Sequence, residues 1–263
     1  MNAFTTLLIT DPAPRVRLVM LNRPDSANAL NTQMGGDLFE YFEDFALNSG
    51  DCRCIVLTGA GTRAFCGGGD LRERNGMSQE AWERQHLIFE RMIRALLACP
   101  VPVIGAINGA AFGGGSEIAL ACDFLYAADT ARFAFPEASL GIMPGCGGTQ
   151  LLPRAVGERR AKELILTSRP FTADQAEQWG MVNRVLPAEQ LMERSLEAAS
   201  AIAATAPLSA MQAKRSIHHG LQMSLPEGLA FEIEAYNRLV PTEDRKEGVL
   251  AFNEKRLPIF HGR

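Results

Sequence analysis

The first two-thirds of the chain alternates short hydrophobic runs with stretches in which apolar residues recur at helical spacing. The runs predict buried strands at Val16–Leu21, Cys54–Thr58, Val103–Ile107 and Phe124–Ala128. The helical spacing predicts amphipathic helices at Thr32–Leu47, Glu80–Leu97 and Ser116–Ala121. Strands separated by helices favour parallel pairing through right-handed crossovers. We therefore expect an α/β core.

From about Pro187 the pattern changes to one helix after another. We expect helices at Glu189–Ala204, Pro207–Gly220, Pro226–Leu239 and Glu243–Lys255, each with an apolar stripe. Little polar surface lies between these stripes, which indicates that part of the region packs on another subunit. The chain is thus divided into an α/β body with the candidate site, residues 1–195, and a helical C-terminal region, residues 196–263.

Composition narrows the possible functions. Hydrophobic residues make up 47% of the chain and charged residues 21%, as in ordinary globular proteins. The net charge of −4 argues against a nucleic-acid surface, and no apolar run reaches the roughly 18 residues that span a bilayer. The N-terminal residues lack the pattern of a signal or transit peptide. We expect a cytoplasmic protein without nucleic-acid or membrane partners.

The cysteines and histidines do not indicate a metal site. The six cysteines are scattered, and no second Cys/His pair accompanies Cys52 and Cys54 at zinc-binding spacing. The four histidines are equally dispersed, and we expect each to be a surface or internally satisfied residue. The sequence predicts neither a disulfide framework nor a bound metal or separate cofactor.

Two glycine triplets, at 67–69 and 113–115, each follow a strand-like run and each precede an acidic residue. Glycine lets backbone N–H groups approach a ligand without interference from a Cβ atom. Two such segments can direct two N–H donors at one oxygen, the minimum for an oxyanion hole. Gly114 lies where a helix is expected to begin, so the helix dipole would reinforce its N–H.

Two other motifs give only weak indications of a function. The segment at 59–64 loosely matches a dinucleotide-binding fingerprint, but the glycines that follow are poor helix formers. Ser116 beside the second triplet lacks the pattern of a nucleophile elbow, and His86 is the only histidine in the α/β body. Ser116 is more simply a residue of the first helical turn.

Glu117 and Glu137 form a candidate acid/base pair. Glu117 belongs to the first turn of a predicted helix, where the dipole favours its ionised form. Glu137 follows Pro136 among apolar residues, so burial is expected to raise its pKa. Two carboxyls whose pKa values are pushed apart can divide the roles of acid and base.

At these residues the chain resembles the enoyl-CoA hydratase/isomerase (crotonase) family, and the likeness covers nearly all of it. The most specific segments are 107–123, 135–137 with 140–151, and 251–256. The resemblance implies a crotonase-like spiral of ββα units with a C-terminal helical region that forms trimers, alone or as a dimer of trimers. It also implies acyl-CoA thioesters as substrates, with CoA as part of the substrate.

By position, the resemblance makes the N–H groups of Gly69 and Gly114 the oxyanion-hole donors and Glu117 and Glu137 the catalytic pair. It places further substrate-binding residues at Ala27, Ala29, Ala64, Gly67, Gly68, Asp70, Leu71, Pro136, Gly145, Phe252 and Lys255. Phe252 and Lys255 would reach the CoA of a neighbouring subunit, and Gly145 would leave room beside the catalytic water. The acyl pocket would be built largely from residues 75–93.

The two glutamates favour a hydratase, because relatives that are isomerases or other lyases usually replace one of them. Such a hydratase would act in fatty-acid or branched-chain acyl-CoA catabolism, and segments 70–74, 161–165 and 241–248 resemble relatives that hydrate methylglutaconyl-CoA. The alternatives are a Δ3,Δ2-enoyl-CoA isomerase or another crotonase-type lyase. A more distant one is an RNA-binding protein, which the low pI and absence of a basic helix disfavour.

Overall fold

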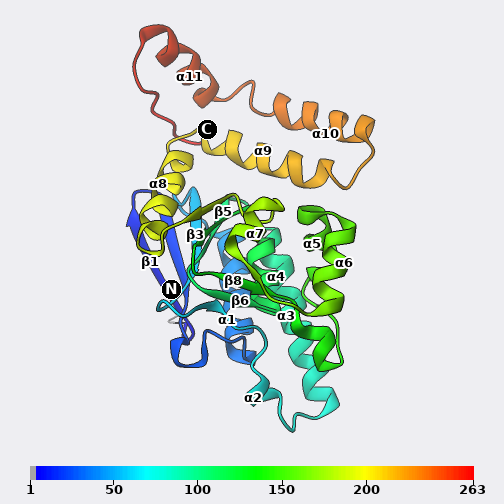
Figure 1. Ribbon diagram of the computed structural model, residues 1–263. Coiled ribbons are helices and arrows are strands. Elements are labelled where there is room, and N and C mark those ends of the chain that lie inside the picture. Colours follow the sequence, from blue (N-terminus) through cyan, green and yellow to red (C-terminus); the bar gives the residue numbers. More distant parts are fainter. Residues whose placement is uncertain (1–3) are drawn as a thin grey trace.

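The computed structural model describes residues 4–263, which fold around two β-sheets (Figure 1). The larger sheet has the strand order β1-β2-β3-β5-β7-β10, and the smaller has the order β4-β6-β8-β9. The strands are β1 (Leu7–Ala13), β2 (Val16–Leu21), β3 (Cys54–Gly59), β4 (Ala64–Cys66), β5 (Val103–Ile107), β6 (Ala110–Phe112), β7 (Phe124–Ala128), β8 (Arg132–Ala134), β9 (Phe171–Thr172) and β10 (Arg184–Leu186).

Helices surround both sheets and continue into a separate C-terminal group. They are α1 (Thr32–Leu47), α2 (Leu71–Arg74), α3 (Gln79–Leu97), α4 (Gly114–Ala121), α5 (Gly148–Val156), α6 (Glu158–Thr167), α7 (Ala173–Gln178), α8 (Leu191–Ala203), α9 (Pro207–Gly220), α10 (Leu225–Asn237) and α11 (Glu243–Glu254). Short 3-10 turns occur at Pro24–Ser26, Pro136–Leu140 and Ala188–Gln190.

The chain repeats one unit three times: a strand of the larger sheet, a three-residue strand of the smaller sheet, and then a helical segment. The strand pairs are β3 with β4, β5 with β6, and β7 with β8. Successive units lie side by side, with parallel pairing of β3 to β5 to β7 and of β4 to β6 to β8. This arrangement is a spiral of ββα units, so the expected fold is confirmed.

The four predicted strands all lie in the larger sheet and pair in parallel, as expected. Strands β3 and β5 are buried at every position, which suits central strands of a sheet covered on both faces. Helix α1 has its predicted bounds, whereas α4 starts two residues earlier than predicted, at Gly114. The earlier start makes Gly114 the first residue of the helix, the position where a backbone N–H lacks an intrahelical partner.

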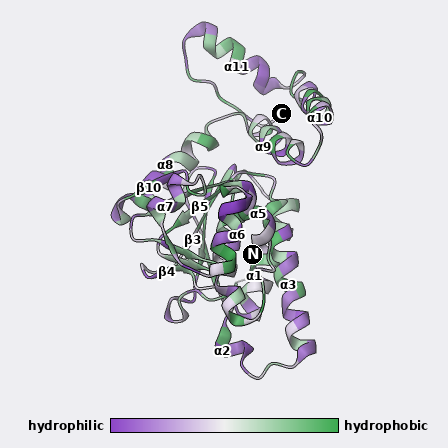
Figure 2. Ribbon diagram, turned by 45° about the vertical axis from the view of Figure 1, so that its right-hand side comes forward, coloured by the Kyte–Doolittle hydropathy of each residue, from purple (hydrophilic) through white to green (hydrophobic). Residues whose placement is uncertain are grey.

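The final helices leave the body of the protein. Helix α8 packs across the larger sheet and therefore belongs to the body. The predicted boundary between residues 195 and 196 falls inside this helix. Helices α9, α10 and α11 stand away from both sheets (Figure 1). Many of their apolar side chains are exposed. Figure 2 colours the hydrophobic residues along these helices green.

Buried polar contacts attach this C-terminal group to the body. The Arg53 guanidinium next to β3 is 5% exposed and donates to the carbonyl oxygens of Ala203 and Phe260 at 3.1 and 2.7 Å. Lys214 on α9 forms an ion pair with Asp123 at 2.7 Å. These contacts fix the point where α9 leaves the body.

Candidate active site

The two glycine triplets come together in the structure. Gly68 has a φ of +89°, and a Cβ atom there would stand 2.6 Å from the carbonyl oxygen of Phe112 and 3.5 Å from the nitrogen of Gly114. Only glycine combines this backbone conformation with so close an approach. Within residues 4–263, no protein acceptor takes the backbone N–H of Gly69 or Gly114 in the turns, loops and helix ends. Two neighbouring N–H donors are therefore available to a ligand.

Ser116 takes part in the structure of this region. It lies in the first turn of α4, fully buried, and its hydroxyl is 2.6 Å from the carbonyl oxygen of Ala111, to which it donates. The sequence interpretation of Ser116 as a structural residue of the first turn is confirmed.

Glu117 is buried beneath the two triplets, with 2% of its surface exposed. The backbone N–H groups of Cys146 and Gly148 donate to its Oε1 at 2.7 and 2.8 Å. Burial raises the pKa of Glu117 to about 7 although these two hydrogen bonds favour its ionised form. The helix dipole favours the ionised form, as the sequence indicates, but desolvation outweighs it.

Glu137 lies in the 3-10 turn after β8 and is 7% exposed. Burial raises its pKa, as predicted. Its Oε2 is buried without a hydrogen-bond partner among the described residues. Gly113, with a φ of +52°, lies against it, since a Cβ there would stand 2.8 Å from Glu137 Oε1. A buried carboxyl oxygen without a partner is suited to a water molecule or a substrate.

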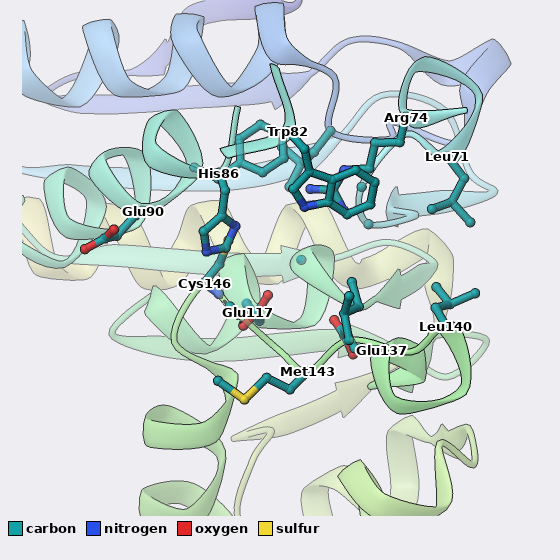
Figure 3. A pocket seen from close by; sticks show the side chains of 18 of the residues that line it. Leu71, Arg74, Trp82, His86, Glu90, Glu117, Glu137, Leu140, Met143 and Cys146 are labelled. Carbon is teal, nitrogen blue, oxygen red and sulfur yellow. Dashed lines mark hydrogen bonds between the residues drawn. The ribbon is translucent and has the colours of Figure 1, made fainter. Parts of the chain in front are cut away.

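Both glutamates face one cavity of about 670 Å³, a size that suits a small organic ligand (Figure 3). The predicted residues that line it are Gly67, Gly68, Gly69, Leu71, Gly114, Glu117, Pro136, Glu137 and Gly145. The wall opposite the glutamates comes from α2 and α3 (Figure 3). Its α3 residues belong to the segment 75–93, and the acyl pocket expected from that segment stays a prediction.

Sequence interpretation missed the side chains of this wall. Arg74, Trp82 and His86 all line the cavity. His86, expected to be a surface or satisfied residue, is half-buried and faces Gly145, where a Cβ would stand 2.4 Å from His86 Cε1. Gly145 thus leaves room for an imidazole ring. Trp82 and His86 are four residues apart on α3, and this spacing was the available signal.

Six predicted binding residues do not line the cavity. The carbonyl oxygens of Ala27 and Ala29 are taken up within the protein, where they accept from Gly67 N at 2.9 Å and from Arg23 Nη1 at 2.6 Å. Ala64 is buried, and Asp70 caps α2 while forming an ion pair with Arg23 at 2.9 Å. The other two, Phe252 and Lys255, are exposed at the end of α11, far from the cavity along the chain.

The described residues bring no group of three metal-ligating side chains together. All six cysteines are free thiols. Nor does any helix of residues 4–263 have the length and apolar character to cross a membrane.

Comparison with known proteins identifies the family. A family model described as enoyl-CoA hydratase/isomerase matches residues 13–263, so the chain belongs to that family. It is 39% identical to the short-chain-enoyl-CoA hydratase of Clostridium acetobutylicum over 95% of each chain. It is 38% identical to the 2,3-dehydroadipyl-CoA hydratase of Escherichia coli, over 97% of this chain and 99% of that protein. The crystal structure of an enoyl-CoA hydratase from Bacillus anthracis superposes with a TM-score of 0.96, at 40% identity, and covers 98% of this chain and 100% of that one.

Proposed function

We propose that this protein is an enoyl-CoA hydratase, a hydro-lyase that adds water in syn fashion across the α,β double bond of an enoyl-CoA thioester. One observation supports the proposal above all: the buried carboxyls of Glu117 and Glu137 line the same cavity as Gly69 and Gly114. The backbone N–H groups of these two glycines have no protein acceptor in the turns, loops and helix ends of the described residues. Membership of the enoyl-CoA hydratase/isomerase family supports the same activity.

The glycine N–H groups supply the electrophilic part of the proposed site. The N–H groups of Gly69 and Gly114 would donate to the thioester carbonyl oxygen and form an oxyanion hole for the enolate. Such a donor contributes about 3–4 kcal/mol to the transition state in comparable enzymes. Gly114 begins α4, so the partial positive charge of the helix N-terminus adds to its effect.

The two glutamates would divide the proton transfers. Glu117 accepts two backbone hydrogen bonds that favour its ionised form, whereas Oε2 of Glu137 accepts none among the described residues. Burial raises the pKa of both carboxyls, so the pair can hold one proton between them, and the proposed mechanism places that proton on Glu137. Ionised Glu117 would take a proton from water as the oxygen attacks Cβ, and Glu137 would donate its proton to Cα.

Removing either carboxyl tests this assignment. Glu117→Gln and Glu137→Gln should each lower kcat for crotonyl-CoA hydration by roughly 10²–10⁴-fold, the usual contribution of a general acid or base. CoA binding, measured by calorimetry, should survive in both. Glu193→Gln, an exposed change on α8, is the control. A near-normal rate in either variant would remove that glutamate from the mechanism.

A Δ3,Δ2-isomerase uses the same oxyanion hole and needs no water. The ratio of kcat/KM for crotonyl-CoA to that for a 3-enoyl-CoA separates the two activities, and a hydratase strongly favours crotonyl-CoA.

The C-terminal helices support a second part of the proposal, self-association as a trimer or a dimer of trimers. On α10, Leu229 and Ile233 are 55% and 54% exposed, and on α11 Phe252 is 84% exposed. Contiguous exposed apolar residues of this kind mark protein interfaces. In such an assembly Phe252 and Lys255 would contact the CoA bound to a neighbouring subunit.

A further inference from the structure

Arg74 is a cation in the cavity that the proposed hydration mechanism does not use. It is the last residue of α2, and its side chain reaches over the cavity wall formed by α3 (Figure 3). The guanidinium carbon lies 4.4 Å from the centre of the Trp82 ring and 5.6 Å from that of Phe89. The two rings hold the guanidinium by cation–π contact, which restricts its orientation.

A buried amide fixes the remaining freedom of Arg74. Its Nε donates to Oε1 of Gln85 at 2.8 Å, and Gln85 is 2% exposed. The Gln85 amide is itself held, because its Nε2 donates to Thr32 Oγ1 at 2.8 Å and to Glu73 Oε2 at 2.7 Å. With Nε occupied, the terminal nitrogens Nη1 and Nη2 are the donors that remain for a ligand.

Those terminal nitrogens have no protein acceptor within residues 4–263, and Arg74 forms no ion pair there. Burial lowers the pKa of Arg74, since its charge is partly removed from water. A half-buried, oriented and unpaired guanidinium is a site for a carboxylate or a phosphate.

The position of Arg74 distinguishes between these two anions. Its Nη1 lies 2.9 Å from where a Cβ of Gly69 would stand, so the guanidinium is next to the proposed oxyanion hole. When the thioester carbonyl occupies that hole, the whole pantetheine arm separates the phosphates of CoA from it. A carboxylate on a short acyl group, in contrast, lies only a few bonds from the carbonyl.

The rest of the cavity would reject such an acyl group. Glu83, Glu90, Glu117 and Glu137 line it, and Arg74 is the one lysine or arginine among the described residues that do so. The acidic side chains of the lining disfavour an anionic acyl group, and Arg74 is the arginine that can offset them.

We infer that Arg74 binds a free carboxylate at the far end of the acyl group, so that the preferred substrate is a short enoyl-CoA with a second, ionised carboxyl. The inference rests on the proposed hydratase activity and names its substrate class. Gln85 is a positioning residue that orients Arg74 and does not itself contact the substrate.

Two substrates of five acyl carbons test this inference. Glutaconyl-CoA carries the terminal carboxylate, and 2-pentenoyl-CoA lacks it, while both carry the same CoA. The wild-type protein should have the higher kcat/KM for glutaconyl-CoA. Arg74→Met should lower that value by roughly 100-fold and change the value for 2-pentenoyl-CoA by no more than about threefold, because only the carboxylate loses a paired hydrogen-bonding partner.

Three further variants make the result specific. Arg74→Lys keeps the charge but loses the two-pronged donor, and should lose roughly tenfold on glutaconyl-CoA alone. Gln85→Met should produce a smaller loss of the same selectivity. Arg91→Met removes an arginine that also stacks on a ring, that of Phe39 at 4.3 Å, but does not line the cavity, and it should leave both substrates unchanged. Thermal unfolding of each variant checks that it is folded.

Each other outcome has a defined meaning. An equal loss on both substrates in Arg74→Met would overturn the inference and assign Arg74 to CoA or to the catalytic glutamates. A wild-type preference for 2-pentenoyl-CoA would also overturn it, yet leave the hydratase proposal intact. Failure of the wild-type protein to hydrate any enoyl-CoA would instead refute the proposed function.

Discussion

Glu117, at the scale of single residues, is subject to opposing electrostatic effects. A helix N-terminus stabilises a carboxylate by about 0.3–1 kcal/mol at exposed sites. Removing a carboxylate from water costs several kcal/mol, even after relaxation. The pKa of Glu117 therefore rises to about 7 despite two backbone hydrogen bonds that oppose the rise. The sequence places Glu117 in a first helical turn correctly, but the pattern along the chain does not reveal how deeply α5 buries it.

This pKa has a kinetic consequence. Glu117 must be ionised to act as the base, so kcat/KM should fall by about tenfold per pH unit below pH 7, and it should fall again at higher pH once Glu137 has lost the proton that it donates. The charge of Glu137 raises the pKa of Glu117, and Glu137→Gln should accordingly shift the residual acid limb to lower pH. In Glu117→Gln the limb should disappear from the pH profile of residual hydration. An unchanged limb in that variant would assign it to another group.

Helices α1 and α3, at the scale of secondary-structure elements, pack closely through a glycine. A Cβ at Gly35 would stand 2.5 Å from the ring of Phe89, whereas one at the next residue, Gly36, would meet nothing within 4 Å. The approach at Gly35 lets α1 support Phe89, which lies against Arg74 on the cavity wall. One glycine is therefore required by packing, and its neighbour is not.

The two positions form a matched pair for measurement. Gly35→Ala should lower the free energy of unfolding by about 1–3 kcal/mol, the usual cost of overpacking. Gly36→Ala should raise it by about 0.4–1 kcal/mol, because alanine restricts the unfolded chain and suits a helix interior. Urea titration monitored by circular dichroism measures both. If the two variants changed stability in the same direction, the packing of α1 on α3 described above would be incorrect.

Sequence patterns predict long elements better than short ones. Helix α1 and strand β2 have their predicted bounds, because several apolar residues repeat with one period in each. Strands β4, β6 and β8 have three residues each, too few to establish a period. These short strands build most of the second sheet, and the hydrophobic pattern therefore does not predict that sheet. The spiral of ββα units could be predicted only from the family resemblance.

The same limit applies to the site. The glycines and glutamates could be predicted because they belong to continuous motifs after β4, around α4 and after β8. Arg74, Trp82 and His86 were missed because tertiary packing of α2 and α3 turns them towards the cavity. Asp70 belongs to a motif as well, but its carboxylate is taken up in capping α2.

The exposed C-terminal helices, at the scale of the whole molecule, determine the expected assembly. Sedimentation should show trimers or hexamers at micromolar concentration. Ile233→Lys should shift the protein towards monomers and raise KM for crotonyl-CoA, since Phe252 and Lys255 of a neighbour would be lost from the CoA site. Glu232→Lys, an exposed change at the adjacent position, should preserve the assembly. A monomeric wild-type protein would contradict the proposed role of α10. The cytoplasmic location stays a prediction.

Arg53 imposes an order of events during synthesis. Its guanidinium is buried beside β3, but its acceptors belong to residues that leave the ribosome 150 to 207 positions later. Until those residues are made, water has to serve as the acceptor for Nη1 and Nη2 of Arg53, and the carbonyl oxygens replace that water when the C-terminal segment folds onto the body. Translation of the C-terminal segment should thus be the step that buries Arg53.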